Sequence, residues 1–154
     1  MPNAELNPGV SFGVEFLRTV TNGDPEAYDF LLRWGKFHRK VDDVIDCNLW
    51  DAEHVLEAFV EGCKFYSHPF YQKNMSVLQM PILMATNFCA VSVKWEREKE
   101  LWKRQWADVL RHSGLQVVES VAMICGGWEL VTKTTAPYLA AMYVDHKDRH
   151  GVPT

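Results

Sequence analysis

One row of histidine and aspartate side chains is the clearest sign of chemistry in this 154-residue chain. His38, Asp42 and Asp46 are spaced four residues apart. On a helix, residues at this spacing lie about 40° apart around the axis, so the three side chains project from one face. Carboxylates one turn apart can hold Mg²⁺, which takes oxygen ligands and keeps waters that a phosphate-bearing substrate can replace. The row therefore predicts a metal site with Asp42, Asp46 and His38 as ligands. The alternative is a set of solvated side chains at an acidic helix end.

The segment Asp42-Asp43-Val44-Ile45-Asp46 resembles a known motif. It looks like the first aspartate-rich motif, Asp-Asp-x-x-Asp, of the isoprenoid (trans-prenyl diphosphate) synthases, an all-α family in which this motif binds Mg²⁺ and the substrate diphosphate. The resemblance implies that Asp42 and Asp46 are the metal ligands. It also implies that Arg39 or Lys40 neutralises phosphate charge.

A second motif of the related terpene cyclases, Asn/Asp-x-x-x-Ser-x-x-x-Glu, is matched in part. Ser92 and Glu96 have the required spacing, whereas Asn87 precedes Ser92 by five residues instead of four. Five residues correspond to about 140° of helical rotation, which turns Asn87 away from the Ser92 face.

Two further groups of titratable residues have spacings that metal sites use. His54, Glu57 and Glu61 share one face of an expected helix, where they form either a surface row of charges or one half of a metal site shared with the His38 row. His146 and His150 are four residues apart, but they lie in a polar tail with no further ligand nearby.

The helix that carries the His38 row is strongly indicated. Asp24 is a good cap and Pro25 suits a first helical turn. Apolar residues then recur at spacings of three and four, which predicts an amphipathic helix to about Asp46: Phe30, Trp34, Phe37, Val41 and Val44.

A second, antiparallel helix is expected next, capped by Asn48 or Asp51 and ending near His68-Pro69. We expect its apolar stripe to face the core: Val55, Leu56, Phe59 and Val60.

Prolines and glycines divide the remaining sequence into further helices. Pro81 is expected to open or kink a long helix that runs to about Leu110, and His112-Ser113-Gly114 ends that element. Another helix is expected over residues 115–131, weakened by Gly126-Gly127, and a last one from Pro137 to Val144.

The expected fold is all-α: an orthogonal or up-down bundle of about five to seven helices. At the N-terminus, alternating apolar residues allow a short strand or an extended arm: Val10, Phe12, Val14 and Phe16. The predicted organisation is an N-terminal arm over residues 1–23, one helical domain over 24–144 and a polar tail over 145–154.

Composition excludes several classes of function. A formal charge of −4 without a long basic run argues against nucleic-acid binding. Four widely spaced cysteines and an N-terminus without a secretory signal predict a cytoplasmic protein. Residues 75–93 are mostly apolar, but Gln79, Pro81 and Asn87 interrupt them, so a buried core helix is expected and no membrane partner.

Two functional hypotheses follow. The first, which is slightly favoured, is a non-catalytic helical homo-oligomer or interaction protein. Four tryptophans motivate it, because one small core does not readily absorb them: Trp50, Trp95, Trp102 and Trp106. The alternative is a Mg²⁺-dependent protein that binds a small phosphate-bearing ligand through Asp42 and Asp46, with an isoprenoid-synthase-like fold.

Overall fold

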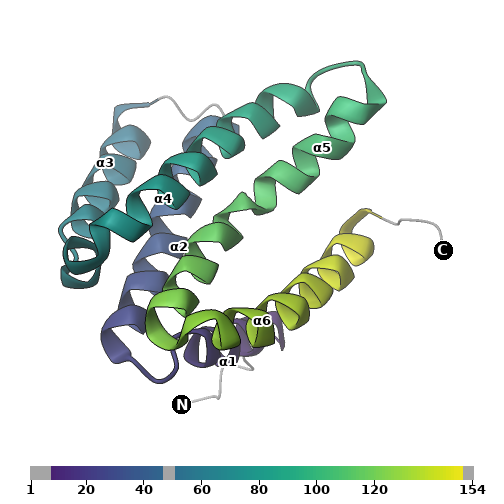
Figure 1. Ribbon diagram of the computed structural model, residues 1–154. Coiled ribbons are helices and arrows are strands. Elements are labelled where there is room, and N and C mark those ends of the chain that lie inside the picture. The colour runs from purple at the N-terminus through teal and green to yellow at the C-terminus, as the bar shows by residue number, and fades with distance from the viewer. Residues whose placement is uncertain (1–7, 47–50, 151–154) are drawn as a thin grey trace, which may run out of the picture.

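The computed structural model describes the backbone of residues 8–46 and 51–150, and the side chains of residues 13–45 and 51–140. Within these ranges the chain is helical and has no strand (Figure 1). The predicted all-α bundle of about five to seven helices is confirmed. The elements are α1 (Pro8–Val20), α2 (Pro25–Asp46), α3 (Ala52–Tyr66), α4 (Pro69–Glu96), α5 (Leu101–Arg111), the 3-10 helix η1 (His112–Gly114) and α6 (Leu115–His150).

The N-terminal segment is a helix from Pro8 onwards, so the expectation of a strand or an extended arm is wrong for residues 8–20. Phe16 and Val20 are four residues apart, and both are buried. The ring centroids of Phe16 and Tyr138 of α6 lie 4.5 Å apart. Helical spacing thus lets α1 bury its apolar side against α6 of its own chain, which an alternating strand pattern would not do.

The starts of α2 and α3 agree with the predicted caps. Asp24 Oδ1 accepts hydrogen bonds from the backbone N–H groups of Glu26 and Ala27, at 2.8 and 3.0 Å. Asp51 caps α3 by accepting from the N–H groups of residues 53 and 54. Both caps satisfy amides that have no partner within a helix.

The region from Pro69 to Arg111 differs from the expectation of one long helix after Pro81. Helix α4 passes through Pro81 and has its kink at Asn74, whose side-chain amide donates to the carbonyl of Phe70. It ends at Glu96, and α5 packs antiparallel to it (Figure 1). The reversal occurs in a run of five charged residues, 96–100, which offers no apolar side chain to hold a continued helix on the core.

Helix α6 bends at Gly127, with φ 67° and ψ −166°, ten residues before the start predicted at Pro137. Glycine is the residue that adopts this conformation at little cost. The side-chain amide of Asn22, in the turn between α1 and α2, donates to the carbonyl of Cys125 just before the bend, at 3.4 Å.

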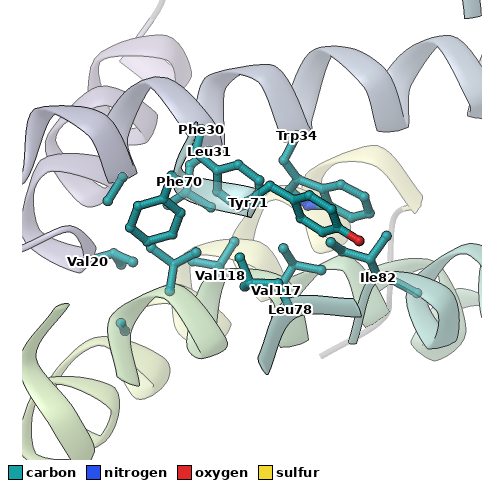
Figure 2. Close-up of a cluster of buried hydrophobic side chains, with 14 of the residues drawn as sticks. Val20, Phe30, Leu31, Trp34, Phe70, Tyr71, Leu78, Ile82, Val117 and Val118 are labelled. Carbon is teal, nitrogen blue, oxygen red and sulfur yellow. The ribbon is translucent and has the colours of Figure 1, made fainter. Parts of the chain in front are cut away.

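The core is aromatic and joins α2, α3, α4 and α6. Figure 2 shows Phe30 and Trp34 of α2 facing Leu78 of α4 and Val117 of α6. Phe30 also stacks on Phe65 of α3, with 5.1 Å between ring centroids. Burying such side chains contributes roughly 1.5–3 kcal/mol each, so this cluster fixes the position of α2.

The apolar stripe of α3 was expected to face the core. In the structure it faces outward. Leu56 is 60% exposed and Phe59 68% exposed, whereas α3 buries Gly62 and Phe65 against α2. An added Cβ on Gly62 would lie 3.1 Å from the ring of Phe37. The small residue therefore lets α2 approach this side of α3 closely and leaves the larger residues outside.

By length and composition alone, α4 and residues 101–140 are apolar enough to cross a membrane. The mostly buried core helices of soluble proteins meet the same criterion, but here 33% of the apolar window in α4 and 22% of that in residues 101–140 are buried, so the expected buried core helix is not what α4 shows.

Candidate functional site

The predicted row on α2 points into the molecule at His38. The imidazole of His38 is half-buried and lies beside the indole of Trp34, with 5.0 Å between ring centroids. Burial lowers the pKa of His38 below its ordinary value, and the nearby charge of Asp42 acts in the opposite direction. His38 is therefore held mainly as a neutral imidazole at pH 7.

Asp42 lies against α4. Its carboxylate is half-buried, and the thiol of the buried Cys89 lies 3.6 Å from its Oδ1, at a distance and angle suited to a weak S–H donor. The partly matched second motif lies on this same helix: Ser92 is one turn beyond Cys89 and Glu96 two turns beyond it. Glu96 accepts a 2.6 Å hydrogen bond from Nη2 of Arg111, at the end of α5.

The residues expected to contact phosphate are paired with carboxylates. Arg39 Nε lies 3.1 Å from Asp43, one turn further along α2, and Lys40 Nζ lies 2.6 Å from Glu57 of α3. The hydrogen bond with Glu57 raises the pKa of Lys40 and lowers that of Glu57. Any role of Arg39 or Lys40 at a phosphate would require these side chains to exchange partners.

The α3 group of titratable residues does not join the His38 row. Glu57 faces Lys40, and Glu61 contacts Lys36 of α2 and Lys64 of its own helix. His54 Nδ1 lies 2.6 Å from the cap residue Asp51. These contacts are those of a surface row of charges between two antiparallel helices.

The predicted ligand set is described only in part. His38 and Asp42 are placed, whereas the side chains of Asp46, His146 and His150 lie outside the described residues. Among the side chains that are described, no three of the His, Cys, Asp and Glu residues gather closely enough to hold a metal ion. The Mg²⁺ site therefore stays a prediction.

A pocket of about 290 Å³ opens beside His38, between α1, α2, η1 and the start of α6. Arg111, Leu115 and Tyr138 share its wall with Trp34 and His38. Sequence reasoning missed Arg111 and Tyr138 because no local pattern connects them with α2. The backbone stays in the right-handed helical region on both sides of η1, at Arg111 and Leu115, so the break at His112-Ser113-Gly114 reverses nothing and gave no signal for Arg111.

A second candidate site is the outward face of α3, which we call the α3 seam. It consists of Leu56, Phe59, Cys63 and Tyr66, spaced three, four and three residues apart, and all four are exposed. This spacing is that of the contact positions in coiled coils.

Comparisons with protein-family models, with curated proteins and with solved structures find no match to this chain.

Proposed function

We propose that this protein is a non-catalytic helical protein that forms a homo-oligomer, with the α3 seam as the contact between copies. The observation that carries the proposal is the seam itself: a regularly spaced apolar row on a well-formed helix, with nothing of its own chain over Leu56 and Phe59 among the described residues. Exposed apolar rows of this kind generally mark surfaces that associate.

The charges around the seam favour a second helix as the occupant. Glu57 and Glu61 are already paired with lysines of α2, so packing another copy against the seam would leave neither carboxylate unpaired. Helices that lie on anionic membranes carry a basic polar face, whereas α3 carries Glu53, Glu57 and Glu61 against Lys64. A second copy of the chain therefore suits this surface better than a lipid layer does.

The amount of exposed apolar surface supports the same proposal. In the described part of the chain, eighteen large apolar side chains are exposed, nearly as many as the twenty hydrophobic residues that form the buried core. Apolar surface that stays in contact with water contributes no hydrophobic stabilisation to a monomer, whereas association would remove part of this surface from water.

Light scattering on the purified protein tests the proposal. The wild-type chain is expected to have a mass that is a multiple of 17.8 kDa, and the double variant Leu56→Lys/Phe59→Lys a mass of one chain with unchanged helicity. Val109→Lys is the matched control, because Val109 is equally exposed but lies on α5. A monomeric wild type, or dissociation by Val109→Lys but not by the seam variant, would reject the α3 seam.

A Mg²⁺-dependent site for a small phosphate-bearing ligand is the second candidate. The observation in its favour is that Asp42 lies half-buried against α4 beside Cys89, one turn from His38, and so is partly shielded from bulk water. Mg²⁺ with pyrophosphate is expected to raise the melting temperature, because a ligand that binds only the native state stabilises it. Asp42→Asn with Asp46→Asn should abolish the shift, while Asp43→Asn should keep it. A shift that survives the double substitution would rule this function out.

A further inference from the structure

The pocket beside His38 is lined by mostly apolar side chains and by a few polar ones. Its volume is about 290 Å³, at the small end of the range for ligand sites. The polar side chains of its lining are His38, Arg111 and His112. Its apolar wall is formed by Leu17, Leu31, Leu115 and Val118, with the rings of Trp34 and Tyr138.

The ring nitrogen Nε2 of His38 is buried and has no hydrogen-bond partner among the residues that the structure describes. It lies near η1, 4.0 Å from where a Cβ on Gly114 would stand. Buried polar atoms in native proteins almost always have a partner, which a bound molecule can supply where the protein does not. This atom is therefore an unused hydrogen-bonding position beside the pocket.

Arg111 and His112, the other polar side chains of the pocket lining, each have a partner within the protein. Glu96 accepts from Arg111 at 2.6 Å, so the guanidinium charge is balanced, and Nδ1 of His112 bonds to the carbonyl of Asp108 at 2.8 Å. A charged ligand would lose its hydration in this pocket without meeting an opposite charge that is still unpaired. The walls and the balanced charge both suit a neutral molecule.

We propose that this pocket binds a small, neutral, mainly apolar molecule with one hydrogen-bonding oxygen, of the phenol or alcohol class. The oxygen would bond to Nε2 of His38, and the apolar body would lie against Leu31, Leu115 and the indole of Trp34. The pocket wall includes no residue of the α3 seam, so it adds a ligand site to a protein whose proposed function is self-association.

Three probes of one shape separate the polar from the apolar contribution: 4-ethylphenol, ethylbenzene and 4-ethylbenzoate. We expect 4-ethylphenol to bind about tenfold tighter than either of the others, the effect of one additional hydrogen bond in a site without net charge. In ¹⁵N-labelled protein it should shift the Nε2 resonance of His38, identified by its loss in His38→Gln. Tightest binding by 4-ethylbenzoate would overturn the neutral class of ligand, and an unmoved His38 resonance would overturn the site.

Two variants test whether 4-ethylphenol binds at His38. His38→Phe removes the ring nitrogen but keeps an aromatic ring beside Trp34, so it should bind 4-ethylphenol and ethylbenzene about equally. Phe59→Lys is the control, because it removes an exposed apolar side chain on α3 and should leave the preference for 4-ethylphenol unchanged. An unchanged preference in His38→Phe, or its loss in Phe59→Lys, would contradict the assignment. The wild-type His38 resonance still tests the site even if His38→Phe does not fold.

Discussion

At the scale of single residues, His68 and His38 differ in their surroundings: both ring nitrogens of His68 have partners, whereas Nε2 of His38 has none among the described residues. His68 is buried at the junction of α3 and α4, where Nδ1 accepts from the N–H of Phe70 at 3.2 Å and Nε2 bonds to Asp29 of α2 at 3.1 Å. His68 thereby caps the start of α4. Its ring links α2 to the start of α4, and its backbone N–H donates to the carbonyl of Phe65 at the end of α3.

Replacing His68 should therefore destabilise the fold. His68→Ala removes the cap and the contact with Asp29, and is expected to lower the free energy of unfolding by about 1–2 kcal/mol. Urea unfolding measures the change, with His54→Ala as the control because His54 is exposed and bonds only within its own helix end. Equal effects of the two substitutions would contradict the role given to His68.

His38 should make stability depend on pH. Burial lowers its pKa in the folded protein, so below the ordinary value of about 6.5 the unfolded chain binds a proton that the folded chain does not. Stability is then lost as the pH falls through that value and is unaffected well above it. The melting temperature of His38→Gln should fall less than that of the wild type between pH 7.5 and 5.5. Parallel curves would show that His38 is not the group involved.

At the scale of elements, helix starts follow from local chemistry, but the partner of each helix face does not. The caps Asp24 and Asp51 act within three residues, so sequence was sufficient to predict them. The outward direction of α3 depends on Gly62 and Phe65 fitting against Phe37 of another helix. A hydrophobic pattern shows that a face is apolar and does not show whether the same chain or another one covers it.

The candidate site shows the same limit. The common face of His38 and Asp42 follows from their spacing, whereas Cys89, which lies against Asp42, comes from 47 residues further along the chain. No pattern in a single sequence measures such a long-range contact, because it depends on how α2 and α4 cross. Likewise, the adjacent glycines Gly126 and Gly127 identified the weak point in α6, but they did not show that the chain bends there.

Two glycines, Gly127 at the bend in α6 and Gly35 in the middle of α2, should respond in opposite ways to replacement by alanine. Gly127 has a positive φ that side chains resist, so Gly127→Ala should cost about 1–3 kcal/mol of stability. Gly35 is exposed in the middle of α2, and an added Cβ would have no atom within 4 Å, so Gly35→Ala should instead stabilise by about 0.5–1 kcal/mol. Thermal unfolding of both variants checks the opposite signs. A stabilising Gly127→Ala would mean that α6 runs straight.

At the scale of the whole molecule, the buried core stabilises the fold, whereas the exposed apolar faces are available for association. The aromatic cluster around Phe30 and Phe65 holds α2, α3 and α4 together, and Tyr66 of the α3 seam packs on its edge against Phe65. Substitutions at Leu56 and Phe59, which face outward, should therefore change association while leaving the fold intact. This separation makes self-association testable apart from stability.

The reactivity of Cys63 tests that central claim most directly, because its thiol lies in the α3 seam and is exposed in the single chain. In a Cys47→Ser background the other thiols interfere little: Cys89 is buried, and burial raises the pKa of Cys125 to about 11. We predict that a maleimide labels Cys63 more slowly as the protein concentration rises, and that Phe59→Lys removes this dependence. A labelling rate that stays the same across the concentration range would contradict the proposal that the α3 seam joins copies of this chain.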